Sequence, residues 1–267
     1  MLKLHIGEFS DMDTKYINSS AIEVLKEKKI LYTSVGGIDE LKEEVCRDLV
    51  ERKGCNYSNK NIIFSNGAKQ GVYQVIKLMC NIGDEVIIIS PYWTSYPEMV
   101  KLVGATPVII ETNYENRFFP TNEQFKRVIT NKTKLIVICN PNNPTGLIIE
   151  ENRMNNFVNF IKNYKNIYIL SDEIYERIDF EKKHISLGRY NSLSKRLFIV
   201  NGFSKVYCMT GYRLGYTVGP EKMITKLVQI QSHITGSPNS IAQYTALKLL
   251  RNVKTNELID KVIKTLD

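Results

Sequence analysis

Short apolar runs and amphipathic stretches alternate along most of this chain. Runs rich in Val and Ile have the length of β-strands, and the stretches between most of them have the apolar period of a helix. The predicted strands cover residues 61–65, 85–90, 107–111, 134–140, 166–171, 197–201 and 214–218. The predicted helices cover residues 19–29, 69–80, 95–103, 122–130, 150–164 and 240–266. This alternation predicts an α/β fold, a three-layer αβα sandwich around a mainly parallel sheet.

The two ends of the chain depart from this alternation. The last helical stretch continues almost to the final residue without a C-cap glycine. We therefore expect an N-terminal segment at residues 1–30, a large domain at 31–240, and a helix at 241–267 that leads to a C-terminal domain beyond the last residue. No Gly- or Ser-rich linker divides the part in between.

The net charge is +8, but it does not indicate a nucleic-acid partner, because lysines account for 26 of the 36 basic residues and are spread along the whole chain. The apolar runs are much shorter than a membrane span, and the N-terminus lacks a secretory signal. The 5 cysteines form no C-x-x-C pair, which argues against a zinc site and a disulfide framework. We expect a cytoplasmic protein without a nucleic-acid, membrane or metal partner.

Candidate binding residues follow the predicted strands, because ligands of open parallel sheets bind at the carboxyl ends of the strands. After the first strand, Gly67, Ala68 and Lys69 open a helix, which suits a phosphate group but is also an ordinary strand–helix turn. After the second strand, Trp93 can stack on a planar ligand or pack in the core. No G-x-G-x-x-G follows any strand, which counts against a dinucleotide site.

Three further polar segments follow the later strands. Residues 140–146, N-P-N-N-P-T-G, form a rigid loop whose Asn side chains are hydrogen-bond donors or simple turn residues. Asp172 follows an apolar run, where an unpaired carboxylate is costly, so it faces a cation or caps a helix. Lys205 lies among apolar and aromatic residues, a setting for Schiff-base chemistry, although most lysines only solvate the surface.

Together these segments resemble the fold type I pyridoxal phosphate enzymes, specifically the class I aminotransferases of the bacterial aspartate aminotransferase branch. The resemblance runs from Gly7 almost to the end of the chain. Its most specific parts are N-P-N-N-P-T-G, S-D-E-I-Y-E from Ser171, and S-K-x-x-x-M-T-G-Y-R-L-G-Y from Ser204. Three such motifs in the family's order imply pyridoxal phosphate as the cofactor, and amino acids and 2-oxo acids as the substrates.

The resemblance implies a role for each residue around the cofactor ring. Lys205 would form the internal aldimine and then move the α-proton of the substrate. Asp172 would pair with the pyridine nitrogen and keep it protonated. Tyr175 and Asn143 would hydrogen-bond the 3′ oxygen, and Trp93 would stack on the ring face.

The resemblance also implies a phosphate site and a partner subunit. The phosphate would be held by a helix N-terminus and two polar side chains: Gly67, Ala68, Lys69, Ser204 and Arg213. Tyr32 matches the tyrosine that in this family reaches the phosphate of the partner subunit, which implies a site completed in a homodimer.

Three departures from the family pattern affect these expectations. Position 202 is Gly, where some relatives carry a hydroxyl, so we expect one phosphate contact fewer. Gly7 and Glu8 match a segment that covers the substrate in the family, but the residues after them differ. The arginine that binds the substrate α-carboxylate belongs to the family's small domain, so no residue of this chain is assigned to it.

The substrate and the reaction are less sharply defined than the cofactor. Lys69 corresponds to a lysine associated with the distal carboxylate of aspartate or glutamate, which predicts an aminotransferase for dicarboxylic amino acids. An aromatic aminotransferase or a C–S lyase would use the same Lys205 and Asp172. A third alternative is a truncated cofactor-binding module without catalytic activity.

Overall fold

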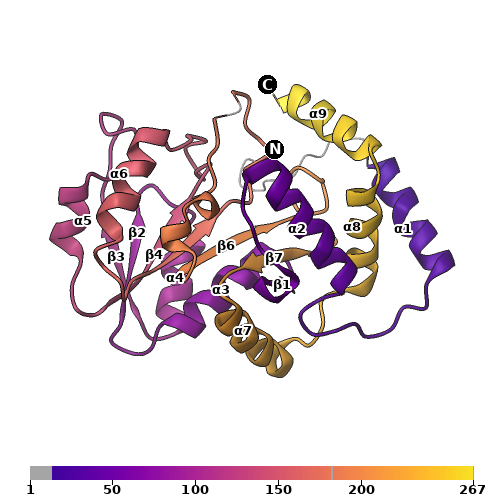
Figure 1. Ribbon diagram of the computed structural model, residues 1–267, viewed down its shortest axis with the longest axis horizontal. Coiled ribbons are helices and arrows are strands. Elements are labelled where there is room, and N and C mark those ends of the chain that lie inside the picture. Colours follow the sequence, from indigo (N-terminus) through magenta and orange to yellow (C-terminus); the bar gives the residue numbers. More distant parts are fainter. Residues whose placement is uncertain (1–13, 182, 267) are drawn as a thin grey trace, which may run out of the picture.

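The computed structural model describes residues 14–181 and 183–266, so Gly7 and Glu8 lie outside the described part. Its centre is a 7-stranded sheet with the order β1-β7-β6-β5-β4-β2-β3 (Figure 1). The strands are β1 (Ile62–Ser65), β2 (Glu85–Ile89), β3 (Thr106–Ile110), β4 (Thr133–Cys139), β5 (Tyr168–Asp172), β6 (Leu197–Gly202) and β7 (Gly215–Val218). Each of the predicted strands is therefore confirmed within a few residues.

The strand directions bring six strand ends to one edge of the sheet. β2, β3, β4, β5 and β6 pair in parallel, whereas β7 pairs antiparallel with both β6 and β1. Two reversals in succession leave β1 running in the same direction as β6. The carboxyl ends of β1 to β6 and the beginning of β7 consequently lie at the same edge, which we call the ligand edge.

Nine helices are found in the described part of the chain, together with three short 3-10 turns. The helices are α1 (Lys15–Glu27), α2 (Asp39–Lys53), α3 (Ala68–Met79), α4 (Ser95–Leu102), α5 (Asn122–Val128), α6 (Glu151–Ile161), α7 (Glu221–Ile234), α8 (Ser240–Arg251) and α9 (Lys254–Leu266). They lie on both faces of the sheet, which confirms the three-layer αβα architecture (Figure 1).

Alternate side chains of each strand enter two separate cores. On β2, Ile87 joins the core shared with α1, α2, α5, α6 and α8. Its neighbours Val86 and Ile88 join the core shared with α3, α4 and α7. The same alternation on β5 separates Ile169 from Leu170. A strand buried on both faces has no polar side, which is why these runs are continuously apolar.

Two helices were missing from the sequence prediction. α2 carries Leu41, Val45 and Leu49 at four-residue spacing, all fully buried, and ends at Gly54 in the left-handed conformation with φ 63°. Its charges also follow the helix dipole, with acidic residues in the first turn and basic residues in the last. The signals for α2 were therefore present; its largely charged surface masked them. The second missing helix, α7, follows Pro220.

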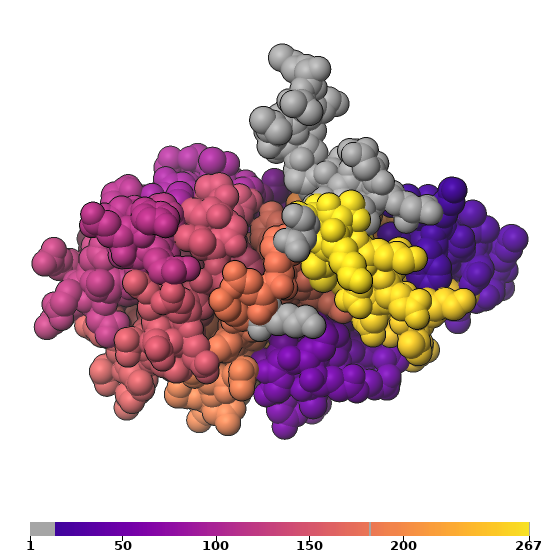
Figure 2. All heavy atoms as spheres, turned by 90° about the horizontal axis from the view of Figure 1, so that it is seen from above, coloured from indigo at the N-terminus to yellow at the C-terminus, as the bar shows by residue number. Residues whose placement is uncertain are grey.

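The single helix predicted at residues 240–266 is wrong: the structure has two helices, α8 and α9. Asn252 is extended, with φ −101° and ψ 121°, and accepts a hydrogen bond from Lys254 N, which breaks the helix between them. Ala246 and Leu249 of α8 are buried against the core, and α9 buries Ile259 and Val262. α8 packs against α1, where Lys248 pairs with Glu23 and Glu27, so segments near both ends of the described chain lie together (yellow and indigo in Figure 2).

The part of the chain that the structure describes contains no disulfide bond, no helix suited to crossing a membrane and no metal-binding cluster. Each of the five cysteines is a free thiol. Within residues 14–181 and 183–266, no helix combines the length and apolar character that crossing a bilayer requires. The same residues contain no cluster of three or more His, Cys, Asp or Glu side chains arranged to hold a metal ion.

Gly215, the first residue of β7, permits the close approach of β7 to the start of α3. A Cβ atom at Gly215 would lie 2.3 Å from Ala68 N and 2.6 Å from the Gly67 carbonyl carbon. Gly215→Ala should therefore lower the free energy of unfolding by about 1–3 kcal/mol, because backbone has to move. Gly211→Ala is the matched control, since its Cβ would meet no atom within 4 Å. Equal thermal midpoints for the two variants would contradict this prediction.

Candidate active site

The polar residues singled out in the sequence collect at the ligand edge. Gly67 joins β1 to α3, which begins with Ala68 and Lys69. Trp93 lies between β2 and α4, and Asn143 follows β4. Asp172 is the last residue of β5, and Tyr175 lies in the turn after it. Ser204, Lys205 and Arg213 lie in the connection between β6 and β7, whose two ends both belong to this edge. The sheet topology thus brings together residues separated by more than 100 positions.

Asp172 is a carboxylate buried inside the protein. Its side chain is 4% exposed and accepts a 2.6 Å hydrogen bond from the Tyr96 hydroxyl and a 3.3 Å bond from Ile174 N. Burial raises the pKa of Asp172, and these two hydrogen bonds offset the rise only in part. The site therefore holds a carboxylate that gains from a positively charged neighbour, such as a protonated ring nitrogen.

Tyr96 is a residue that the sequence analysis did not assign. It stands in the first turn of α4, three residues after Trp93, and its ring makes an edge-on contact with that indole at 5.3 Å between centroids. The side chain is 2% exposed, so its hydroxyl needs an internal partner, which Asp172 supplies. The sequence offered one signal, a tyrosine within the polar segment 90–96, but not its partner.

Tyr175, Asn143 and Lys205 form a second group beside Asp172. Asn143 Nδ2 donates a 3.3 Å hydrogen bond to the Tyr175 hydroxyl oxygen, and Lys205 Nζ lies 5.6 Å from the centroid of the Tyr175 ring. Burial, with smaller contributions from the nearby Cys139 and Asp172, raises the pKa of Tyr175 to about 12. At neutral pH the hydroxyl keeps its proton, and because it accepts from Asn143, it can donate that proton to a ligand oxygen.

A cradle of backbone and positive charge begins at Gly67. Gly67 has φ 79°, and a Cβ atom there would lie 2.5 Å from Arg213 Nη2, so the guanidinium sits directly against this glycine. Arg213 itself adopts φ 55° and donates to Thr210 O at 2.8 Å. α3 begins at the next residue, and the first N–H groups of a helix have no partner inside the helix. This combination suits a phosphate group.

Lys69 and Trp93 form the outer wall of the cradle. Lys69 is exposed, and its Nζ lies 4.9 Å from the centroid of the Trp93 ring. Trp93 is half-buried, so one part of its surface packs against Tyr96 and another remains accessible. Ser204 is largely buried in the connection that precedes β7. A cation and an aromatic ring thus lie next to each other beside the cradle, at a position that we call its entrance.

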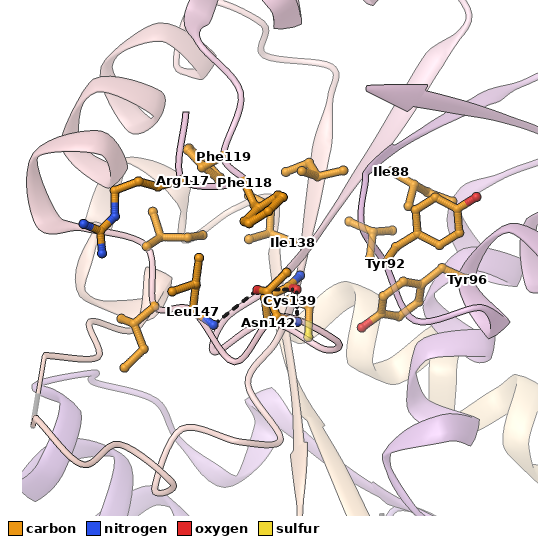
Figure 3. A pocket seen from close by; sticks show the side chains of 15 residues that line it. Ile88, Tyr92, Tyr96, Arg117, Phe118, Phe119, Ile138, Cys139, Asn142 and Leu147 are labelled. Atoms are coloured by element: carbon orange, nitrogen blue, oxygen red, sulfur yellow. Dashed lines mark hydrogen bonds between the residues drawn. The ribbon is translucent and has the colours of Figure 1, made fainter. Parts of the chain in front are cut away.

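Two of the loop asparagines hold the loop rather than face a ligand. Asn140 Oδ1 accepts from Ile149 N at 3.0 Å, and Asn142 bonds Thr145 and Pro91 O. Figure 3 shows Asn142 beside Tyr92, Tyr96 and Cys139 around a small cavity. The cavity measures about 20 Å³, which suits a water molecule and not a cofactor.

Two positions singled out in the sequence, Tyr32 and Gly202, do not contribute a side chain to this group of residues. Tyr32 is 95% exposed and lies in the connection between α1 and α2, so it presents its ring to the outside of this chain. Gly202 lies in β6, where a Cβ atom would approach Gly215 Cα and Leu214 O to 2.9 Å. The backbone of β7 fills the space that a side chain at position 202 would require.

Comparison with known proteins gives a consistent result. Residues 1–265 match the family model described as "Aminotransferase class I and II". The aspartate aminotransferase of Geobacillus stearothermophilus is 38% identical over 249 residues, which cover 92% of this chain and 63% of that protein. A bifunctional aspartate aminotransferase and glutamate/aspartate-prephenate aminotransferase of Petunia hybrida is 35% identical, covering 99% of this chain and 56% of that protein. The chain thus spans about three fifths of the length of these relatives.

Solved structures share the fold over nearly the whole chain. The aspartate aminotransferase of Rhizobium meliloti superimposes with a TM-score of 0.93 at 27% identity, covering 97% of this chain and 65% of that one. An aromatic aminotransferase of Pyrococcus horikoshii reaches the same TM-score at 29% identity, covering 97% and 70%. Two structures with different substrate names match equally well, so the fold alone does not identify the substrate.

The raised pKa of Asp172 has a consequence for stability. The folded state favours the protonated acid, so ionisation destabilises the cofactor-free protein once the pH rises above 3.8, the ordinary value of an aspartic acid. Asp172→Asn should therefore raise the thermal midpoint of the cofactor-free protein at pH 7, and the gain should shrink as the pH approaches 4. The exposed Asp260 provides the control variant Asp260→Asn. A midpoint at pH 7 that stays unchanged or falls in Asp172→Asn would contradict the prediction.

Proposed function

This chain belongs to the class I and II aminotransferase family, and from this membership we propose that it moves an amino group between an amino acid and a 2-oxo acid with the help of pyridoxal phosphate. The observation that carries the proposal is the joint presence at one sheet edge of a buried carboxylate, a lysine and an anion cradle. Asp172, Lys205 and the Gly67–Arg213 contact supply these three parts.

The residues present fit pyridoxal phosphate, which is a planar ring with a basic nitrogen, a hydroxyl oxygen, an aldehyde and a phosphate. The Gly67–Arg213 cradle, with Ala68, Lys69 and Ser204, would hold the phosphate. Asp172 would face the ring nitrogen, since its buried carboxylate gains from a cationic partner. Tyr175 and Asn143 would bond the ring oxygen, and Trp93 would cover the ring face.

The bound cofactor would supply an electron sink that stabilises negative charge on the substrate Cα. Asp172 would face the ring nitrogen and favour its protonated form, and Tyr96 holds the Asp172 carboxylate in place through its 2.6 Å hydrogen bond. Tyr175 would donate a hydrogen bond to the ring oxygen. Lys205 Nζ would take the proton from the substrate Cα and hold it within the site.

Dicarboxylic amino acids are the proposed substrates. Lys69 places a cation 4.9 Å from the Trp93 ring centroid, at the entrance to the cradle, where it would attract the distal carboxylate of aspartate or glutamate. Relatives at 35–39% identity carry aspartate aminotransferase in their names. The second candidate is an aromatic amino acid, because the Pyrococcus horikoshii enzyme has the same fold.

We further propose that the working form is a homodimer in the cytoplasm. Tyr32 supports the dimer, because a large aromatic side chain that is 95% exposed in one chain can reach a second chain. A tyrosine hydroxyl at that position would complete the partner's phosphate cradle. Five free thiols favour a reducing compartment.

Replacement of Lys205 tests the proposed cofactor chemistry. The unsubstituted protein mixed with pyridoxal phosphate should develop a visible absorption band, and L-aspartate should then convert it to the pyridoxamine form. Lys205→Ala should lose the band, because the proposed amine partner of the aldehyde is removed, while its circular dichroism spectrum stays unchanged. Lys226→Ala, at an exposed position of α7, is the control. An undiminished aspartate response in Lys205→Ala would refute the proposed function.

Replacement of Lys69 tests the substrate class. Lys69→Met removes the cation at the cradle entrance and should raise the L-aspartate concentration needed for half-conversion by about tenfold, because the distal carboxylate loses its partner. The L-alanine concentration needed for half-conversion should change little, because alanine has no such carboxylate. Lys77→Met alters an exposed lysine in the last turn of the same helix and serves as the control. Equal losses for aspartate and alanine would exclude this role.

A further inference from the structure

A cluster of buried charges lies behind the turn that follows Asp172. We define the turn clamp as Arg52 and Lys53 at the end of α2, together with Glu173 and Glu176 of the turn. Lys53 Nζ lies 3.0 Å from Glu173 Oε2 and also contacts the Glu176 carboxylate, and Arg52 Nη2 lies 2.8 Å from Glu176 Oε1. The Lys53, Glu173 and Glu176 side chains are at most 5% exposed. The clamp thus joins elements that are 120 positions apart in the sequence.

The two carboxylates at the end of β5 point to opposite faces of the sheet. Asp172 has the same parity along β5 as Leu170, and it bonds Tyr96 on the side of α4. Ser171 and Glu173 have the other parity, and Ser171 Oγ donates to Glu173 Oε1 at 2.9 Å. Glu173 meets Lys53 on the side of α2. A displacement of Glu173 therefore moves Asp172, its direct neighbour.

Both carboxylate oxygens of Glu173 accept hydrogen bonds. Oε1 accepts from Ser171 Oγ at 2.9 Å, Ser186 Oγ at 3.0 Å and Leu187 N at 3.3 Å, while Oε2 bonds Lys53. The backbone of the turn is also closed, since Glu176 N donates to Glu173 O at 3.0 Å. Tyr175 lies between these two anchored glutamates. Its backbone is consequently held on both sides.

Glu176 is ionised at neutral pH. Burial alone would raise the pKa of Glu176, but the charges of Lys53 and Arg52 outweigh it and lower the pKa to about 2. Replacing a buried ion pair by apolar side chains of similar volume is often neutral or stabilising. We therefore explain this buried ion-pair network by the position that it gives to the turn after β5, and not by a gain in the free energy of unfolding.

We propose that Lys53 and Glu173 are positioning residues for the cofactor, which fix the turn that carries Asp172 and Tyr175 from the face opposite the ligand. This inference rests on the proposed function for the identity of the ligand. It adds two residues that do not touch the cofactor themselves. Their effect reaches it through the backbone of residues 172–176.

The same helix supplies a matched control. Glu44 of α2 is 6% exposed and pairs with Arg251 of α8 at 2.8 Å, more than two helical turns before Lys53. This pair joins α2 to α8 and has no contact with the turn after β5 among its hydrogen bonds in the described structure. Arg251→Met thus removes one partner of a buried carboxylate without touching the clamp.

The test compares Lys53→Met, Lys53→Met/Glu173→Gln and Arg251→Met with the unsubstituted chain. Lys53→Met alone leaves the buried Glu173 carboxylate without its cation, whereas the double variant removes both charges of this pair and so keeps the test decisive where the single variant fails to fold. Glu176 keeps Arg52 as its partner in both variants. The first readout is the dissociation constant of pyridoxal phosphate. The second is the fluorine resonance of Tyr175 in cofactor-free protein labelled with fluorotyrosine, identified by its loss in Tyr175→Phe.

We expect both clamp variants to bind pyridoxal phosphate about 10- to 100-fold more weakly, because a displaced turn misplaces two of its partners. Their Tyr175 resonance should shift or broaden, and that of Arg251→Met should not. Unchanged affinity and resonance in the double variant would overturn the inference. An unsubstituted chain that binds no pyridoxal phosphate would refute the proposed function, and the Tyr175 resonance alone would then decide whether the clamp fixes the turn.

Discussion

The carboxylate of Asp172 is held inside the protein at the end of β5, where burial raises its pKa and where it accepts hydrogen bonds from the Tyr96 hydroxyl and from Ile174 N. Burial outweighs these hydrogen bonds and the nearby charge of Lys205, so the carboxylate favours a cationic ligand. The neighbouring groups follow from that requirement: Tyr96 fixes the carboxylate, and Lys205 and Arg213 stand at the same edge. The ionised Asp172 carboxylate therefore destabilises the ligand-free protein and strengthens the binding of a cationic ligand.

The sequence predicted the sheet and most of the proposed ligand residues, for physical reasons. Strands buried on both faces leave an unmistakable apolar run, and the carboxyl-end rule directs attention to Gly67, Asn143, Asp172 and Lys205. The break between α8 and α9 was missed because no Gly or Pro marks residues 252–253. Tyr96 and Lys53 could not be assigned from the sequence, since their roles come from contacts with Asp172 and Glu173, 76 and 120 positions away.

The end of β5 presents residues with different roles on its two faces. Asp172 and Tyr96 lie on the side of α3 and α4, together with the phosphate cradle. Glu173 and Lys53 lie on the side of α2, where the charges are satisfied within the protein. The strand alternation that separates the two apolar cores also separates a group that meets a ligand from a group that holds the backbone.

The reversal of β7 has a consequence for how such a chain can change over evolutionary time. Because β7 runs against β6, both ends of the 203–214 connection lie at the ligand edge, and Lys205 and Arg213 stand near its two ends. One loop thus spans the distance between the proposed reactive amine and the proposed phosphate anchor. Insertions and deletions inside this loop change the distance between Lys205 and Arg213. Insertions in the β7–α7 connection at Gly219 and Pro220 leave that distance unchanged, because this connection lies at the opposite edge of the sheet. We therefore expect the β7–α7 connection to tolerate changes in length, whereas the 203–214 loop keeps its length.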